Sequence, residues 1–161
     1  MPHWAKDLKF GARTINARAE SLATTPAFRD AFAARRCLIP ASGFYEWKKD
    51  GSTRTPYAIV PADEPLFAFA GLWENWRDRS GGKDAPWIRT CSIVTGEPNP
   101  VLAWPRWLGE EEASGEPLSA LLTPFPPERM RLYPVSARVN SVKNDDAGLI
   151  EPLLATGGTT V

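Results

Sequence analysis

Apolar and polar positions follow two different periods along this chain. Phe28 and Phe32 stand four residues apart, which is the spacing of one helical face. Thr25 and Pro26 precede them and are typical of a helix N-cap and a first helical position. We therefore predict a helix over residues 27–35. Apolar runs rich in β-branched and aromatic residues predict strands over 37–39, 44–47, 57–60, 66–73 and 88–95.

Turn-forming residues separate these predicted strands. Residues 40–43 (PASG) predict a turn, and residues 49–52 (KDGS) predict a hairpin turn, because Asp-Gly tolerates positive φ. A polar loop is predicted over 77–85, and short helices are predicted over 118–122, 127–132 and 145–154. Strands in series with few short helices indicate an α+β fold and argue against a doubly wound sheet.

Length and composition indicate one ordinary globular domain. The chain has 161 residues, 43% of them hydrophobic and 24% charged, so we predict a single domain over 1–154 and a flexible tail over 155–161. Seven tryptophans are many for this length; Trp73 and Trp76 are expected in the core. The net charge of zero argues against a wholly basic surface but leaves room for a local groove near the early arginines, which are Arg13, Arg18, Arg29, Arg35 and Arg36.

Cysteine usage and hydropathy indicate the cellular location of the protein. Cys37 and Cys91 are the only cysteines, and their apolar, strand-like surroundings predict buried free thiols. No Cys/His spacing suggests zinc, so no metal is expected. The sequence shows no signal peptide and no apolar run of membrane-spanning length. These features predict a cytoplasmic protein with no membrane association.

One carboxylate stands inside an aromatic run, residues 43–47 (GFYEW). On a strand, Glu46 shares a face with Phe44 and Lys48, while Tyr45 and Trp47 take the other face. Burial among rings would disfavour the charged carboxylate and leave a group able to donate a proton near neutral pH. The alternative is an exposed strand-end glutamate paired with Lys48 or Lys49.

Several short motifs in series resemble the SRAP family, the SOS-response-associated, abasic-site-processing proteins. They are TINARAE at 14–20, RCLIPASGFYEW at 36–47, FAGLW at 69–73, SIVT at 92–95, YPVS at 133–136 and VN at 139–140. The resemblance covers nearly the whole chain in the family's order. It implies a curved, mostly antiparallel sheet closed into a pseudo-barrel, with short peripheral helices. It also implies that single-stranded DNA with abasic sites is the partner and that the protein needs no cofactor. We expect a monomer.

The family chemistry that the resemblance implies is covalent capture of an abasic site. The opened sugar presents an aldehyde; the amine of an N-terminal cysteine condenses with it, and the thiolate closes a thiazolidine. Lyase-type and autopeptidase activities are also implied. Glu46 matches the family's catalytic glutamate, which would open the sugar ring and carry protons. Asn16 matches the asparagine that positions the sugar, although an amide could instead satisfy buried backbone groups.

Three further residues match DNA-binding positions of the family. Arg18 matches an arginine that grips phosphate, for which a planar guanidinium is suited, but it could pair with Glu20 instead. Trp4 matches an aromatic wedge that stacks on a base, but it could be core or disordered. Thr95 matches a contact to the DNA backbone, but it could be a structural strand-end residue.

The chain departs from the family pattern in two places. The family's Met-Cys-Gly-Arg start is not seen, since Met1 is followed by a segment that resembles the interior of the family domain. The family's His-x-Arg-Met-Pro motif is also not seen, and His3 does not match it. A polypeptide of these 161 residues is therefore expected not to crosslink abasic DNA stably. One alternative is an inactive remnant that only binds single-stranded DNA.

A carbohydrate-active or carbohydrate-binding module is the alternative from another class, because tryptophans and a buried glutamate also suit sugars. Hydrolysis would need a second carboxylate at catalytic separation from Glu46, and Glu74 is the only obvious partner.

Overall fold

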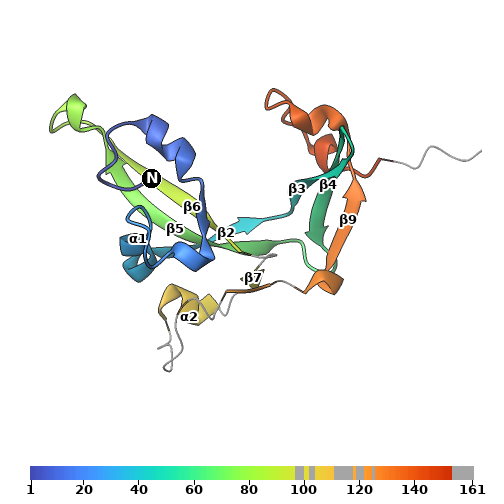
Figure 1. Ribbon diagram of the computed structural model, residues 1–161, viewed down its shortest axis with the longest axis horizontal. Helices are drawn as coiled ribbons and strands as arrows, with labels where there is room; N and C mark the ends of the chain where they lie inside the picture. The colour runs from blue at the N-terminus through green and yellow to red at the C-terminus, as the bar shows by residue number, and fades with distance from the viewer. Residues whose placement is uncertain (97–99, 102–103, 111–117, 119–121, 125, 154–161) are drawn as a thin grey trace, which may run out of the picture. The chain divides into compact units, whose positions relative to one another are not determined.

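The computed structural model describes residues 1–96, 100–101, 104–110, 118, 122–124 and 126–153. The chain divides into two compact units. Unit 1 comprises Met1–Pro40 and Ala68–Pro126, and unit 2 comprises Ala41–Phe67 and Pro127–Val161. Figure 1 labels the elements of both units. The predicted tail over 155–161 and most of the predicted helix over 118–122 lie outside the described residues.

Unit 1 is built on a four-stranded sheet with the strand order β1–β6–β5–β2. β1 runs parallel to β6, and β5 runs antiparallel to β6. The strands are β1 (Asn16–Arg18), β2 (Arg36–Ala41), β5 (Phe67–Arg77) and β6 (Trp87–Thr95), with a small pair β7 (Pro100–Val101) and β8 (Thr123–Pro124). The helices are α1 (Arg29–Ala34), α2 (Trp104–Leu108) and the 3-10 turns η1 (Leu8–Arg13), η2 (Ala19–Ser21) and η3 (Arg79–Gly81).

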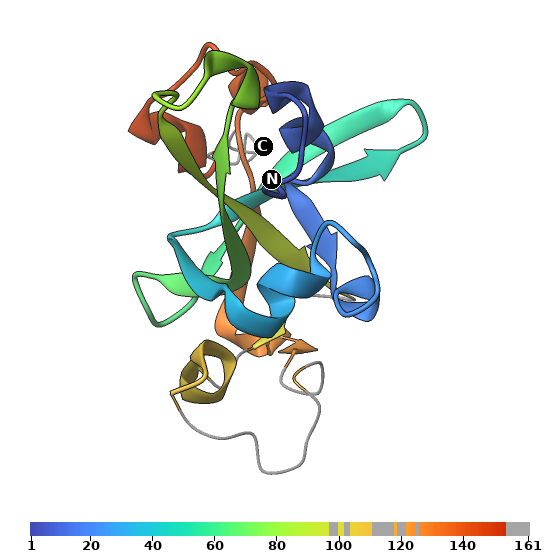
Figure 2. The ribbon, with the colours of Figure 1, turned by 90° about the vertical axis from the view of Figure 1, so that its left-hand side faces the viewer.

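The main core of unit 1 lies on one face of this sheet, which we call the inner face. Ala17, Leu72 and Val94 point to it from three neighbouring strands and are almost fully buried. Phe28 and Ala31 of the α1 region pack there, as does the indole of Trp107 from α2. Figure 2 shows α1 beside the strands of this sheet. A second cluster joins Trp76 to Met1 and Ala5.

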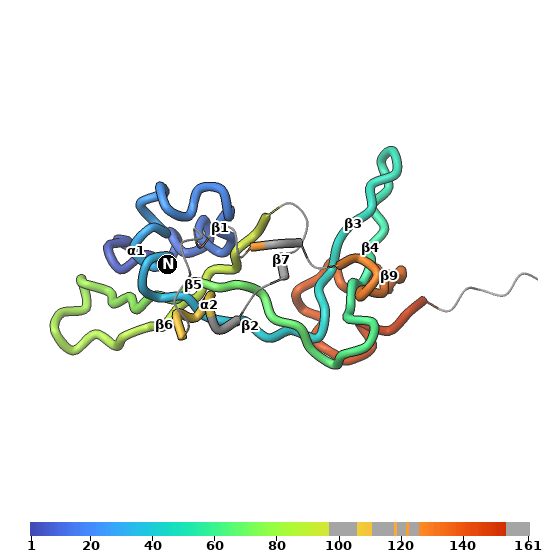
Figure 3. Tube along the Cα trace, turned by 90° about the horizontal axis from the view of Figure 1, so that it is seen from below, coloured from blue at the N-terminus to red at the C-terminus, as the bar shows by residue number. Residues whose placement is uncertain are grey.

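Unit 2 is an antiparallel sheet in the order β3–β4–β9. Its strands are β3 (Phe44–Asp50), β4 (Thr53–Pro61) and β9 (Met130–Pro134), accompanied by the 3-10 turns η5 (Pro127–Arg129), η6 (Ala137–Asn140) and η7 (Ala147–Ile150). β9 pairs only with the second half of β4, so the tip of the β3–β4 hairpin extends past it, as Figure 3 shows. The core contains Ala58, Val60 and Val135.

The α+β prediction is confirmed, and the five predicted strands are present with longer bounds. The strands form a four-stranded sheet, a three-stranded sheet and the small β7–β8 pair, and the described residues form no closed barrel. The Asp-Gly hairpin turn is confirmed, with Gly51 at φ 57°. α1 is shorter than predicted, but Phe28 and Phe32 do face the core.

Four local predictions are wrong. Residues 40–43 are not all turn, since β2 continues through Ala41. The helix predicted over 127–132 is limited to one 3-10 turn, because Met130–Pro134 pairs with β4 as β9. The helix predicted over 145–154 is a single turn at Ala147–Ile150. The loop predicted from residue 77 begins later, because β5 extends through Arg77.

Gly43 of the GFYEW motif has a packing reason to be glycine. A Cβ at this position would lie 2.8 Å from Val60 Cγ1 and 3.0 Å from the Ile59 carbonyl oxygen. The YPVS motif at 133–136 has a structural role as well. Val135 is buried, and the Tyr133 hydroxyl donates to the Ile150 carbonyl at 3.0 Å.

Candidate functional site

Three of the five residues singled out in the sequence lie together at one end of the β1–β6 ladder. The register pairs Asn16 with Ile93, Ala17 with Val94 and Arg18 with Thr95. Paired residues of neighbouring strands point to the same side of a sheet, and side chains alternate along each strand. Because Ala17 and Val94 are buried on the inner face, Asn16, Arg18 and Thr95 point to the opposite face. We call this second face the outer face.

The side chains of this strip are accessible. Asn16 and Arg18 are exposed, and Thr95 is partly exposed. Arg18 and Thr95 line a depression of about 680 Å³ together with Glu20 and Gly96. Among the described residues no ion pair joins Arg18 to Glu20, so the alternative of an internal pair is not realised in this structure. The guanidinium is therefore available to an anion from outside.

Two other early arginines serve the fold. The Arg36 guanidinium donates to the carbonyls of Phe32 and Ala33 at the end of α1, at 2.8 and 2.7 Å, and to the carbonyl of Trp107. Arg35 is held by Glu74, as described below. The early arginines therefore do not all form an accessible basic surface. Among them, Arg18 is the arginine that lies beside Thr95.

Trp4 lies apart from the Arg18–Thr95 depression. It lines a separate pocket with Lys6, Lys9, Phe10 and Arg13, as well as Asp7. Its ring packs edge-on against Phe10, with ring centroids 5.2 Å apart, and it remains 42% exposed. Trp4 is therefore not a core residue in this structure. It is an exposed aromatic side chain beside three basic residues, which sequence reasoning did not connect to it.

Glu46 lies in unit 2, on β3 opposite Tyr57 of β4. The expectation that it is partly buried is wrong, since the residue is exposed. β3 is an edge strand, and its aromatic residues contact other partners. Phe44 packs on Phe67 at 6.0 Å between ring centroids, and Tyr45 packs against the core of unit 2. The rings next to Glu46 in sequence therefore do not enclose its carboxyl group.

Asn140 is a residue whose role the sequence did not reveal. Its Oδ1 accepts a hydrogen bond from Trp47 Nε1 at 2.7 Å. This bond joins two of the motifs that carry the family resemblance, GFYEW and VN, although 93 residues separate them. The occurrence of Asn140 within a motif was the available signal, but the pairing itself depends on the fold.

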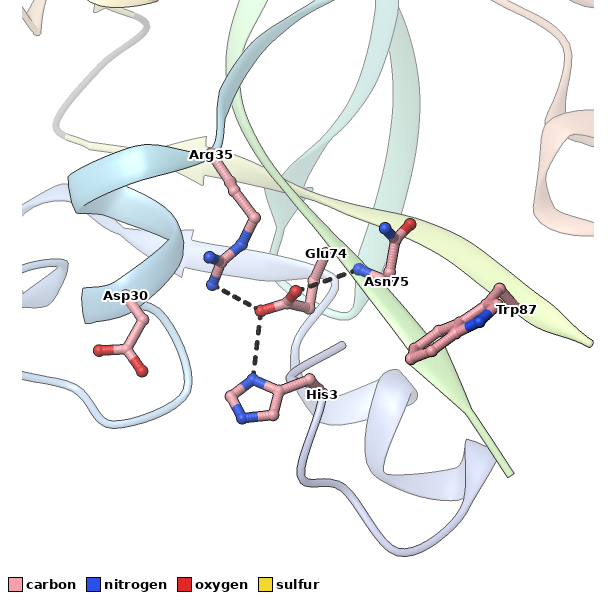
Figure 4. Close-up of a pocket in the computed structure, with 6 residues that line it drawn as sticks. All are labelled: His3, Asp30, Arg35, Glu74, Asn75 and Trp87. Carbon is pink, nitrogen blue, oxygen red and sulfur yellow. Dashed lines mark hydrogen bonds and ion pairs between the residues drawn. The ribbon is translucent and has the colours of Figure 1, made fainter. Parts of the chain in front are cut away.

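Glu74 is engaged in an ion cluster, shown in Figure 4. Its Oε2 accepts from Arg35 Nη2 at 2.7 Å and lies 3.5 Å from His3 Nδ1, and its Oε1 accepts from the Asn75 backbone N–H at 3.1 Å. The Glu74 side chain is only 14% exposed. A carboxylate so paired suits a structural role, and it belongs to unit 1, whereas Glu46 belongs to unit 2. Glu74 is therefore not the free second carboxylate that glycoside hydrolysis would require.

The cysteines differ from the prediction of two buried thiols. Cys37 is partly buried, and burial raises the pKa of its thiol, with a smaller contribution from nearby Cys91. A raised pKa makes Cys37 a weaker nucleophile at neutral pH, because the thiolate is the reactive form. Cys91 is exposed because it alternates with the buried Ser92 on β6 and so points to the outer face.

Within the described ranges the structure contains neither a metal-ligand cluster nor a membrane-spanning helix. No group of three or more His, Cys, Asp or Glu side chains there is arranged to hold a metal ion. None of the helices in that part of the chain has the length and apolar character needed to cross a bilayer.

Comparison with known proteins gives a consistent result. The family model described as SOS response associated peptidase (SRAP) matches residues 1–142. The chain is 41% identical to the abasic site processing protein YoaM of Bacillus subtilis, covering 94% of this chain and 71% of that protein. It is 30% identical to the abasic site processing protein YedK of Escherichia coli, covering 86% of this chain and 67% of that one.

A solved structure has the same fold. The crystal structure of a Bacteroides thetaiotaomicron protein matches with a TM-score of 0.80 at 27% identity, covering 95% of this chain and 73% of that chain. The family model spans most of the sequence, and the relatives align with nearly all of it. This chain therefore belongs to the SRAP family of SOS-response-associated proteins.

Proposed function

We propose that this chain processes abasic sites in DNA and that it holds single-stranded DNA on the outer face of unit 1, where β1 and β6 meet. The observation that carries the proposal is the convergence of Asn16, Arg18 and Thr95 on one accessible face. Three relatives, two from Bacillus subtilis and one from Bacillus phage SPbeta, are about 40% identical and bear the name abasic site processing protein. Family membership and side-chain placement thus support the same activity.

The proposed roles on unit 1 follow from the residue types. Arg18 offers a planar set of N–H donors to a phosphate, and Thr95 offers a hydroxyl beside it. Asn16 lies two residues before Arg18 on the same strand face, about 7 Å away along β1. An uncharged amide at that distance can donate to and accept from a sugar whose phosphate Arg18 holds. We propose Trp4, in its separate pocket, as a stacking surface for a base.

The covalent step that the family resemblance implies needs an amine and a thiol on one N-terminal cysteine. The amine attacks the sugar aldehyde, water leaves, and the thiolate adds to the resulting imine carbon to close the ring. For Glu46 we propose the proton transfers of this sequence, namely opening of the sugar hemiacetal and departure of water. Its exposure on β3 leaves the carboxyl group accessible from solvent.

The proposal extends to the location and the oligomeric state of the protein. A DNA-processing protein of this family is expected in the cytoplasm, associated with the nucleoid when bound to DNA. A monomer is expected.

Arg18→Ala is expected to weaken binding to single-stranded DNA and to flatten its salt dependence. Loss of one phosphate contact should reduce the slope of log K against log salt by about 0.7. Fluorescence anisotropy with a labelled abasic oligonucleotide, at several salt concentrations, measures both quantities. Arg131→Ala is the matched control, because it removes one exposed arginine from β9 of unit 2. Equal affinity and slope for Arg18→Ala and the parent chain would contradict the proposed phosphate contact.

A further inference from the structure

The outer face continues along β5 and β6 well beyond Arg18 and Thr95. The antiparallel register pairs Trp73 with Cys91, Asn75 with Arg89, and Arg77 with Trp87. These residues alternate with the buried Leu72 and Trp76, so they occupy the face that Asn16 and Arg18 also occupy. From Thr95 to Trp87 the strand β6 is about 27 Å long, which is room for several stacked nucleotides.

Two arginines and two tryptophans interleave on this part of the face. The Arg77 guanidinium carbon lies 4.9 Å from the ring centroid of Trp87, and that of Arg89 lies 5.0 Å from the ring centroid of Trp73. Arg89 Nε also donates to Asn75 Oδ1 at 3.2 Å, and Arg77 Nη1 donates to the Lys83 carbonyl at 3.1 Å. The cations are thus held in place over the rings before any partner arrives.

This pattern is suited to an extended anion with flat groups. Within the described part of the chain neither Arg77 nor Arg89 forms an ion pair with a carboxylate. The Trp87 ring is 64% exposed, so much of its surface is uncovered. Guanidinium groups that track phosphates and aromatic rings that stack on bases are the two components of sequence-independent single-strand binding. An apolar protein partner would not require two unpaired cations at the centre of the contact.

Four acidic residues lie near this surface, and within the described residues none of them forms an ion pair with Arg77 or Arg89. Glu74 points away from the outer face and is paired with Arg35. Asp78, at the start of the turn after β5, accepts hydrogen bonds from the Ser80 backbone N–H and hydroxyl at 2.8 and 2.6 Å. Asp30 and Trp87 both line the pocket that also contains Glu74 (Figure 4). Asp84 lies in the turn between β5 and β6.

We propose that the outer face of the β5–β6 hairpin is a second segment of the single-stranded DNA track. Arg77 and Arg89 hold phosphates there, and Trp87 stacks on a base. The inference rests on the proposed function, because the single-stranded DNA that lies over Asn16 and Arg18 would continue over Arg89 and Trp87. It assigns the hairpin to DNA that flanks the lesion on one side.

The test compares oligonucleotide lengths. The full chain is first titrated with an oligonucleotide of about six nucleotides that carries a central abasic site. It is then titrated with two longer oligonucleotides, one extended by about eight nucleotides on the 5′ side and the other by the same length on the 3′ side. We expect extension on one side only to tighten binding. Trp87→Ala should lower the affinity for that longer oligonucleotide by on the order of ten-fold, whereas Trp87→Phe should retain most of the gain in affinity. Arg77→Ala/Arg89→Ala should lower the salt slope for that longer oligonucleotide by about 1.4.

Control variants distinguish failure of the second DNA-binding segment from failure of the proposed function. Arg54→Ala/Arg131→Ala removes two exposed arginines from unit 2 and should keep the full gain on extension. Arg77→Lys/Arg89→Lys preserves charge and should keep most of the salt slope. No gain on extension in the parent, or an undiminished gain in the hairpin variants, overturns the second segment. Failure of the parent to bind even the short abasic oligonucleotide overturns the proposed function itself.

Discussion

Glu46→Gln is expected to slow covalent capture of abasic single-stranded DNA by about 10² to 10⁴-fold. Proton transfer by a positioned side chain contributes acceleration of this size, and an amide of the same shape can neither accept nor deliver the proton. The rate is measured by quenching timed samples on a denaturing gel. The protein used carries the N-terminal cysteine that the family resemblance implies, since that residue supplies the amine and the thiol.

The matched control for this prediction is Asp50→Asn. Asp50 lies four residues from Glu46 on the same strand and is also exposed, so the substitution makes the same chemical change at a nearby place. We expect its capture rate to equal that of the parent. DNA affinity should be nearly unchanged in Glu46→Gln, which separates chemistry from binding. A Glu46→Gln protein that captures DNA at the parent's rate would exclude the proposed proton transfer.

Trp107→Ala is expected to have the largest effect on stability, a loss of about 3–5 kcal/mol in the free energy of unfolding. The Trp107 side chain is fully buried and packs in the main core of unit 1, with its ring 6.1 Å from that of Phe32. Its Nε1 donates to the Cys37 carbonyl at 3.0 Å. Truncation therefore leaves a cavity and an unpaired carbonyl at the start of β2.

Urea denaturation followed by far-UV circular dichroism measures this change. Trp107→Phe keeps most of the packing but loses the indole donor, so its cost should be smaller, about 1–2 kcal/mol. Trp87→Ala provides the exposed control and should shift the free energy by less than about 0.5 kcal/mol. A Trp107→Ala protein as stable as the parent would show that α2 does not pack on unit 1 as described.

The elements that the sequence predicted best are those whose pattern is local. Phe28 and Phe32 mark the buried face of α1 through their spacing, and Asp50-Gly51 marks the hairpin turn through its backbone preference. β9 was missed because its pairing with β4 joins segments about 75 residues apart, and that pairing overrides a weak local helical pattern. The Trp47–Asn140 hydrogen bond is likewise a product of the fold.

The residues of the candidate site could be predicted from the sequence, but the contacts that surround them could not. The alternation of Asn16, Ala17 and Arg18 on a strand is enough to place the two polar residues on one face. The sequence could not show that Arg18 avoids Glu20, or that Arg35 and Arg36 are used by the fold. It also placed Glu46 among rings that, in the structure, contact Phe67, the unit 2 core and Asn140. Residues next to Glu46 in the sequence therefore do not surround its side chain in the structure.

The central claim is that this protein captures abasic sites in single-stranded DNA, and intact mass spectrometry tests it most directly. The natural gene product is incubated with an oligonucleotide that carries one abasic site, and with the same oligonucleotide without the lesion. The account predicts a species with the mass of protein plus abasic oligonucleotide minus one water, formed without borohydride and absent with the intact oligonucleotide. No such species, together with equal affinity for the two oligonucleotides, would contradict the account.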